Sequence, residues 1–291
     1  FVIFMTAQGR SPVQFSISRF VRLYPTYWIC LTITSVALIS IGDGRLPLSF
    51  TQYLANLTMI QRLFGVPHVD GVYWSLMVEI RFYALVLLVI LTRQMARVEY
   101  LLAGWLVAAF LLLKLVEIPW LTFLLFPEWA AYFIAGATSY LIRSREQSTL
   151  RWLIFAGSLA LAIVSVFQRP ATEVIWTSAQ DPYNVAAIVA VFYFVFVLIA
   201  LGITKFIRSP VFVGVGALTY PLYLLHENFG YVLINAFHPF VPDSVLVAAV
   251  ILLMLGLSWV IARWDGSYLS PTLTSWLKTN AKRLPARLHA A

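Results

Sequence analysis

Long apolar runs separated by short polar segments dominate the pattern along the chain. Eight of these runs carry few charges and approach the roughly 20 residues that a helix needs to cross a bilayer. They are 23–41, 72–92, 100–113, 129–142, 152–167, 182–204, 211–235 and 244–262. The pattern therefore predicts an all-α fold, a polytopic transmembrane helix bundle with eight full spans.

Two shorter segments add to this picture. The chain opens on an apolar run, 1–7, without a starting methionine or the basic flank of a signal peptide. We interpret this run as the end of another membrane helix, with a short apolar N-terminal tag as the alternative. Residues 42–71 are predicted to form an outside loop, in which 50–64 is apolar enough for an interfacial helix.

Composition supports a membrane protein and excludes several other classes. Of the 291 residues, 61% are hydrophobic and 11% are charged, against roughly 45–50% and 25% in a soluble domain. A chain of this length cannot bury that much apolar surface, so a water-soluble monomer is excluded. Disordered, collagen-like and disulfide-rich classes are excluded too, and the single cysteine, Cys30, cannot form an internal disulfide.

The net charge of +8 orients the chain in the membrane. The loops on one side hold Arg10, Arg19, Arg22, Arg93, Arg97, Arg143, Arg145, Arg151, Lys205, Arg208, Arg263, Lys278, Lys282, Arg283 and Arg287. The opposite loops hold only Arg45, Arg62 and Arg169. Because basic loops face the cytoplasm, the first side and the C-terminus are predicted to be cytoplasmic, and no nucleic-acid partner is expected. Residues 264–291 are expected to form a cytoplasmic basic tail on anionic lipid headgroups.

One predicted span buries ionisable residues. On a helix, Ser75, Glu79 and Tyr83 share one face, and Trp74 and Arg81 share another. Glu79 and Arg81 point nearly oppositely, so each needs its own partner. Ionisable groups inside a membrane are costly and indicate function, although a polar pair that only holds the bundle together is the alternative.

A second span contains a histidine, His226. Tyr223 and His226 share one face of a helix, while Tyr220, Tyr223 and Glu227 line the adjacent face. Pro221 is expected to kink the span and open room for a ligand or water. A buried histidine can move a proton near neutral pH; a hydrogen-bonded structural histidine is the alternative.

The two spans are predicted to meet. Counted along their helices, Glu79 and His226 lie at similar depth toward the outer face, about 10 Å and about 8 Å from it. This coincidence favours one shared site.

A third group faces the cytoplasm. Arg19 and Arg22 are three residues apart, so they share a helical face and can clamp a phosphate, and Tyr27 follows in the same segment. Positive-inside anchoring with an aromatic belt explains the same residues without a ligand.

Three motifs carry a resemblance to a known family. They are R-x-x-R-L-x-P-x-Y-W at 19–28, W-S-L-x-x-E-x-x-F-Y at 74–83 and T-Y-P-x-Y-L-x-H at 219–226. Taken together and in this order, they resemble membrane acyltransferase family 3, which contains bacterial O-acetyltransferases of lipopolysaccharide, exopolysaccharide and other surface glycans. The resemblance covers essentially the whole chain.

The resemblance implies an architecture and a reaction. Family members typically have ten membrane helices and transfer acetyl, or another short acyl group, from cytoplasmic acyl-CoA to a glycan hydroxyl, which implies the bacterial inner membrane. The family's usual catalytic histidine lies in its first helix. The run at 1–7 resembles the end of the second helix, so we expect an N-terminally incomplete acyltransferase domain over 1–291 that lacks this histidine.

Roles follow for the residues named above. Glu79 and His226 are the catalytic candidates, and Arg19, Arg22 and Tyr27 are candidates for binding acetyl-CoA. The candidates for the acceptor site or for support of the catalytic groups are Trp74, Ser75, Arg81, Tyr83, Tyr220 and Tyr223. The expected partners are acyl-CoA, a glycan or lipid-linked saccharide, and membrane lipids, and no metal is expected.

Two other functions are compatible with buried Glu, Arg and His. A multispan transporter or flippase for a glycan, lipid or small solute uses such residues as relays, but it should show internal repeats, which the sequence lacks. A non-catalytic subunit that binds a partner in the bilayer is the third interpretation.

Overall fold

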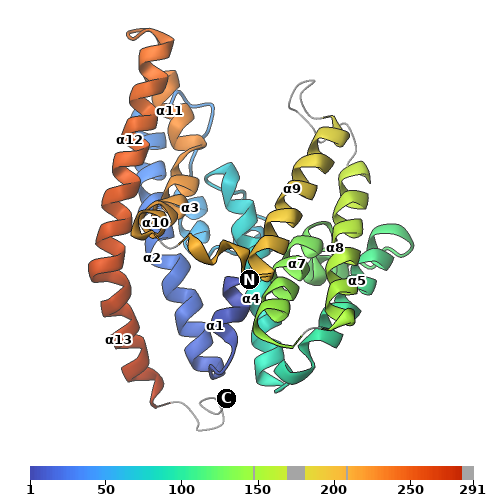
Figure 1. The fold of residues 1–291 in the computed structure, drawn as a ribbon. Coiled ribbons are helices and arrows are strands. Elements are labelled where there is room, and N and C mark those ends of the chain that lie inside the picture. Colours follow the sequence, from blue (N-terminus) through green and yellow to red (C-terminus); the bar gives the residue numbers. More distant parts are fainter. Residues whose placement is uncertain (147, 169–180, 208, 284–291) are drawn as a thin grey trace. The chain divides into compact units, whose positions relative to one another are not determined.

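The computed structural model describes residues 1–146, 148–168, 181–207 and 209–283. Within these ranges the fold is all-α, with helices joined by turns and no strand (Figure 1). Arg169, Arg208 and Arg287, which the sequence assigns to loops, lie outside the described residues. The predicted all-α polytopic bundle is confirmed.

Among the described residues, seven helical stretches are long and apolar enough to cross a membrane. They are Pro12–Ile41, Gly71–Leu91, Met95–Lys114, Pro119–Ser144, Thr149–Gln168, Pro182–Ala200 and Asp243–Ala281. These stretches overlap seven of the eight predicted spans.

The prediction of one continuous helix over 211–235 is wrong. Helix α10 (Pro210–Leu225) ends at Leu225, and a separate helix, α11 (Asn228–Phe237), begins after Glu227. Glu227 has φ −91° and ψ −93°, which lies outside the helical region.

The break does not lie at the proline. Pro221, which was expected to kink the span, lies inside α10, and the helix continues past it to Leu225. The N–H of Asn228 then bonds to the Asp70 side chain at 3.0 Å instead of continuing the ladder of α10. Hydrophobic periodicity does not reveal such a competing acceptor from a distant segment, so the apolar run looked continuous.

The described residues form two compact units, and unit 1 holds residues 1–12 and 81–207. Its elements are α1 (Val2–Ala7), the second half of α4 (Trp74–Leu91), a 3-10 turn (Met95–Arg97), α5 (Val98–Lys114), α6 (Pro119–Leu125), α7 (Pro127–Ser144), α8 (Thr149–Gln168), α9 (Pro182–Ala200) and a 3-10 turn (Ile203–Phe206). Helix α7 packs against α1, α5, α8 and α9. Its buried face carries Ala130, Ala135 and Gly136, small residues that let neighbouring helices approach closely.

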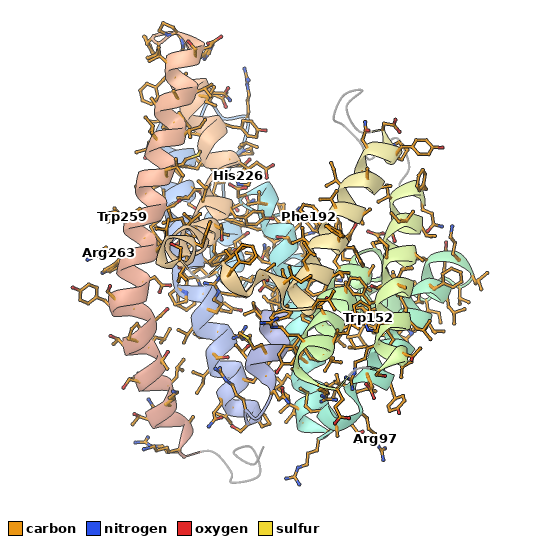
Figure 2. All side chains as sticks on the ribbon, viewed as in Figure 1. Arg97, Trp152, Phe192, His226, Trp259 and Arg263 are labelled. Atoms are coloured by element: carbon orange, nitrogen blue, oxygen red, sulfur yellow. The ribbon has the colours of Figure 1, made fainter. Side chains whose placement is uncertain are left out.

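Unit 2 holds residues 13–80 and 209–283. Its elements are α2 (Pro12–Ile41), α3 (Phe50–Asn56), 3-10 turns at Gln61–Phe64 and Gly71–Tyr73, the start of α4, α10, α11, α12 (Asp243–Trp264), a π-helical segment (Asp265–Leu269) and α13 (Ser270–Ala281). Helix α12 packs against α10 and α11. On α12, the guanidinium of Arg263 lies 5.9 Å from the ring centroid of Trp259 (Figure 2). The predicted interfacial helix at 50–64 is helical only in part, as α3 and the turn after it.

The segment predicted as a basic tail begins as a helix. The π-helical segment continues α12 directly into α13. The Asp265 carboxylate fixes this segment, because it accepts hydrogen bonds from the hydroxyls of Thr26, at 3.0 Å, and Ser270, at 2.8 Å. Residues 284–291 of the predicted tail lie outside the described residues, and its place on lipid headgroups stays a prediction.

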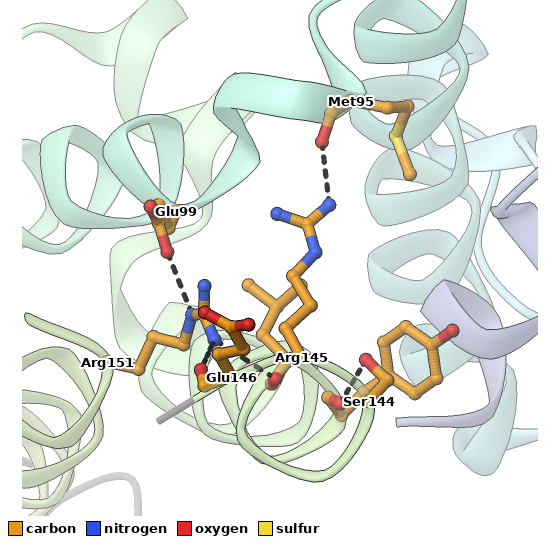
Figure 3. Close-up of polar contacts among 8 residues, drawn as sticks. Met95, Glu99, Ser144, Arg145, Glu146 and Arg151 are labelled. Atoms are coloured by element: carbon orange, nitrogen blue, oxygen red, sulfur yellow. Dashed lines mark hydrogen bonds and ion pairs between the residues drawn. The ribbon is translucent and has the colours of Figure 1, made fainter. Parts of the chain in front are cut away.

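A buried ion pair ties the ends of helices together in unit 1 (Figure 3). Nε of Arg151 on α8 lies 2.8 Å from the carboxylate of Glu99 on α5, and the two side chains are 9% and 16% exposed. Arg151 also donates to the carbonyl of Glu146, while Arg145 donates to the carbonyl of Met95 at 3.2 Å. These bonds connect the segments around residues 95–99 and 141–151, both predicted to be cytoplasmic.

Substitution Glu99→Ala is expected to lower the free energy of unfolding by about 3–5 kcal/mol, because it leaves the buried Arg151 without its counter-charge. Thermal unfolding of the purified protein in detergent measures the change. The control is Asp43→Ala, which breaks a pair with Arg45 whose side chains are 40% and 79% exposed, and it should cost less than about 1 kcal/mol. Equal losses for the two variants would contradict the assignment.

Candidate functional site

A polar cluster in unit 2 surrounds the break between α10 and α11. The Asp70 carboxylate joins two segments there: Oδ1 accepts the N–H of Val72 at 3.2 Å, and Oδ2 accepts the N–H of Asn228 at 3.0 Å. The Asn228 side chain donates in return to the carbonyl of Val69 at 2.9 Å. One carboxylate therefore caps the 3-10 turn before α4 and the first turn of α11.

The charge surroundings of Asp70 are unusual for an aspartate. Its side chain is fully buried, and burial raises its pKa from 3.8 to about 6. The other effects on this pKa are smaller than that of burial: the N–H groups of Val72 and Asn228 and the charge of His226 lower it, and the carboxylate of Glu227 raises it. The Glu227 carboxylate lies against Gly71, where any side chain would displace it.

Next to the Asp70 carboxylate, two hydroxyl groups share one carbonyl as hydrogen-bond acceptor. The hydroxyls of Ser75 and Tyr223 lie 2.7 Å apart, and the carbonyl of Val72 can accept from Tyr223 at 2.9 Å or from Ser75 at 3.2 Å. Two protons serve these three contacts, so the pair has two alternative donor arrangements. The predicted meeting of the two intramembrane motifs is confirmed by this pair.

The imidazole of His226 emerges at the C-cap of α10 and is exposed. Nδ1 lies 2.8 Å from the backbone carbonyl of Tyr223. A carbonyl can only accept, so Nδ1 carries the proton and Nε2 is the basic nitrogen of the neutral ring. Glu79, one helical turn beyond Ser75 on α4, is half-buried and lies close enough to the Tyr223 hydroxyl to act on it electrostatically.

Aromatic residues of α2 anchor the loop that carries Asp70. Tyr27 donates to the carbonyl of Asn56 at 2.7 Å, Trp28 to Leu57 at 2.9 Å and Tyr24 to Thr58 at 2.9 Å. These carbonyls lie at or just after the end of α3, and that of Asn56 also accepts the N–H of Met59 at 3.1 Å. Tyr27 is fully buried, so it fixes this loop and does not present its ring to a ligand.

The fully buried Asn56 connects this anchor to Asp70. Its amide donates to the carbonyls of Gln52 at 2.8 Å and Pro67 at 3.0 Å, and its Oδ1 accepts the N–H of Val69 at 3.0 Å. Val69 directly precedes Asp70, so the position of the carboxylate follows from contacts that begin on α2.

The predicted donor-binding residues lie along α2 and α10. The exposed guanidinium of Arg22 lies 5.7 Å from the ring centroid of Tyr220, whose hydroxyl donates to the carbonyl of Leu23 at 3.1 Å. Arg19, one turn earlier on α2, donates to the hydroxyl of Ser18 at 3.2 Å. Arg22 and Tyr220 are thus brought together.

The remaining candidates divide between the units. Trp74 at the start of α4 belongs to unit 2 and is 43% exposed. Arg81 and Tyr83 belong to unit 1. Arg81 donates to the carbonyl of Phe123 at 2.7 Å, and Tyr83 is buried.

Sequence reasoning missed Asp70 and Asn228. Asp70 stands in the predicted outside loop 42–71, where a carboxylate draws no attention. A signal was nevertheless present, because an aspartate directly before an apolar run is a typical N-cap residue. Its second bond, to Asn228, joins residues 158 positions apart and has no local signature.

Comparison with known families identifies the chain. The family model described as an acyltransferase domain, that of membrane acyltransferase family 3, matches residues 1–263. The chain belongs to membrane acyltransferase family 3. No curated protein and no solved structure matches the sequence.

Membership and the apolar helices together make the chain an integral membrane acyltransferase. A transporter or flippase, the alternative kept open by the sequence, is not what this family assignment supports. For the acyltransferase, the polar side chains around the break between α10 and α11 are candidates for handling the proton of an attacking hydroxyl.

The buried Asp70 predicts a pH dependence of the acyltransferase's stability. Its pKa in the folded state, about 6, lies above the ordinary 3.8, so the folded state binds the proton more tightly than the unfolded state. Binding of this proton therefore stabilises the folded state fully below pH 3.8, and this contribution is lost as the pH rises through about 6. The total loss in the free energy of unfolding is about 3 kcal/mol. Unfolding in detergent from about pH 4 to about pH 7 measures this loss.

In the Asp70→Asn variant, the decrease in the free energy of unfolding between about pH 4 and about pH 7 should be smaller than in the wild type by about 3 kcal/mol, because the titrating carboxyl group is absent. Asp43→Asn, at an exposed carboxylate, is the matched control and should keep the wild-type pH dependence. An Asp70→Asn variant with the wild-type pH dependence would contradict the account.

Proposed function

We propose that the protein transfers an acetyl or other short acyl group from cytoplasmic acyl-CoA to a hydroxyl of a cell-surface or exported glycan. The observation that carries the proposal is the exposed imidazole of His226, whose Nδ1 donates to the Tyr223 carbonyl and whose Nε2 is thereby the basic nitrogen. A base of this kind, on the same helix end as the half-buried hydroxyl of Tyr223, suits the activation of a hydroxyl nucleophile.

The reaction needs one proton transfer in each direction. As the acceptor oxygen attacks the thioester carbon, Nε2 of His226 takes the hydroxyl proton. The carbon–sulfur bond breaks, the acyl group stays on the acceptor oxygen as an ester, and the CoA thiolate leaves. The imidazolium then returns the proton to that thiolate, so the products are the acylated glycan and CoA.

The donor is held by Arg19 and Arg22 in this proposal. Guanidinium groups suit phosphate because their donors form a fork that meets two oxygens at once. Tyr220, which packs beside Arg22, and His226 are six residues apart on the same stretch, roughly 9 Å at 1.5 Å per residue. An extended acyl-CoA arm that starts at the arginines would run along α10 toward the imidazole.

Other residues of the cluster serve the acceptor and the transition state. The exposed ring of Trp74 offers a surface for a sugar, and the hydroxyls of Ser75 and Tyr223 are donors that can turn toward a developing oxyanion. Glu79 is the second group able to handle a proton. Tyr83, buried one turn beyond Glu79 on α4, supports this helix face.

The proposed membrane is the bacterial inner membrane, with the C-terminus in the cytoplasm. The distribution of basic loops supports this orientation. Arg145, at the end of α7, and the buried Arg151, at the start of α8, belong to these basic loops.

His226→Gln is expected to lower the rate of acyl transfer by about 100-fold or more, because the amide cannot accept the hydroxyl proton. The assay follows label from radioactive acetyl-CoA into glycans of membrane vesicles that contain the protein. His238→Gln is the matched control, since His238 is also exposed and its Nδ1 lies 2.9 Å from the carbonyl of Asn235, three residues earlier. Transfer that survives in the His226 variant, at normal protein levels, would remove the catalytic assignment.

Removing both arginines, with Arg19→Ala and Arg22→Ala, should raise the KM for acetyl-CoA at least about tenfold, since charge-assisted bonds to phosphate contribute about 1.5–3 kcal/mol each. Initial rates at varied acetyl-CoA give KM and kcat separately. Arg263→Ala, at an exposed arginine that also lies over an aromatic ring, is the control. An unchanged KM in the double variant means that the donor is held elsewhere.

A further inference from the structure

The π-helical segment Asp265–Leu269 interrupts one long helix in unit 2. Helix α12 runs directly into this segment, and α13 continues from it (Figure 1). The family model matches residues 1–263, so membership of the family assigns no role to the segment. Single π-helical turns are rare and frequently lie at functional sites.

The π-helical geometry brings two polar side chains together. The N–H of Ser270 bonds to the carbonyl of Asp265, five residues earlier. In an α-helix, side chains five residues apart point about 140° away from each other. The wider π-helical turn places them close to one face, and the Ser270 hydroxyl donates to the Asp265 carboxylate at 2.8 Å. A regular helix would separate this carboxylate from this hydroxyl.

The pair contacts α2 at the turn that a proline weakens. Pro25 lies inside α2 and has no N–H, so the carbonyl of Val21 lacks its usual donor from four residues later. The Ser270 hydroxyl lies 3.4 Å from this carbonyl and can donate to it in place of Asp265. The other carboxylate oxygen of Asp265 accepts the hydroxyl of the buried Thr26 at 3.0 Å. The π-helical segment therefore contacts α2 on both sides of Pro25.

Helix α10 contacts the same turn of α2. Tyr220 donates to the carbonyl of Leu23 at 3.1 Å. Val21 and Leu23 are buried, whereas the side chain of Arg22 between them is exposed, with its guanidinium 5.7 Å from the ring centroid of Tyr220. The backbone that carries Arg22 is thus fixed at its neighbours, while the guanidinium stays accessible.

A fixed backbone matters for an arginine that binds phosphate. Two parallel hydrogen bonds to phosphate oxygens form only when the guanidinium fork is correctly placed. A turn weakened by proline would have to be ordered when the ligand binds, and that ordering lowers the affinity. Contacts that order the turn in the free protein remove part of this cost.

We propose that Asp265 and Ser270 are positioning residues for the acyl donor, because they fix the proline turn of α2 so that Arg22 meets a phosphate of CoA. The inference rests on the proposed function, which assigns Arg22 to the donor. Neither residue touches the donor in this proposal, so both act through Arg22.

Equilibrium binding of CoA to the full chain in nanodiscs tests the proposal. Asp265→Ala should raise the Kd for CoA about tenfold and Ser270→Ala about threefold, with kcat at saturating acetyl-CoA changed by less than about twofold. Asp265→Asn should recover most of the affinity, because its amide can still pair with both hydroxyls. The matched control is Ser267→Ala, at an exposed serine of the same π-helical segment, and it should keep the wild-type Kd.

The Arg22→Ala variant separates positioning from a general loss of structure. If Asp265 acts through Arg22, adding Asp265→Ala to Arg22→Ala should raise the Kd by less than about twofold further. An equal rise with and without Arg22 would make the segment a structural support only and overturn the proposal. A fall in kcat as large as the rise in Kd would do the same.

The outcomes also separate this proposal from the proposed function. Weaker CoA binding in Arg22→Ala, with wild-type binding in the Asp265 and Ser270 variants, removes the positioning role and leaves the proposed function standing. CoA binding that depends on all three residues, without acyl transfer from any acyl-CoA, keeps the positioning role and removes the proposed function. A wild-type protein that does not bind CoA contradicts both.

Discussion

The capture of the Asn228 N–H by the Asp70 carboxylate is the interaction on which the candidate site depends. In a membrane environment a non-helical backbone persists only where its polar groups find partners inside the protein. Asp70 supplies that partner and caps the turn before α4 at the same time. The apolar span is thereby divided, and His226 lies at a helix end instead of in the middle of a continuous helix.

A carboxylate can hold this position only because the segment around it is fixed. Tyr27 and its aromatic neighbours on α2 anchor the end of α3, and the Asn56 side chain ties that end to Val69. Every one of these bonds joins a side chain to a backbone group. The loop that the sequence presents as a connection outside the membrane is therefore a structural part of the site.

The helices could be predicted from the sequence because their signal is local, and seven of the eight expected spans overlap an observed one. That the two motifs meet was also predictable from the counted depths of Glu79 and His226, but the observed contact joins Ser75 and Tyr223. The break at Glu227 was not, because its cause is an acceptor 158 positions away. Nor could the sequence reveal that the Tyr27 hydroxyl donates to the carbonyl of Asn56, or that the Arg81 guanidinium lies over the rings of Phe123 and Phe126. Helix faces do not specify contacts between distant segments.

The central claim is that the acyl donor reaches the imidazole at this helix break. Treatment of the membrane-embedded protein with bromoacetyl-CoA tests it most directly, because a basic ring nitrogen near the acyl carbon displaces bromide and becomes covalently labelled. The account predicts modification of Nε2 of His226, prevented by excess acetyl-CoA, with no modification of His238. Labelling of both histidines alike, or labelling of His226 that acetyl-CoA does not prevent, would contradict it.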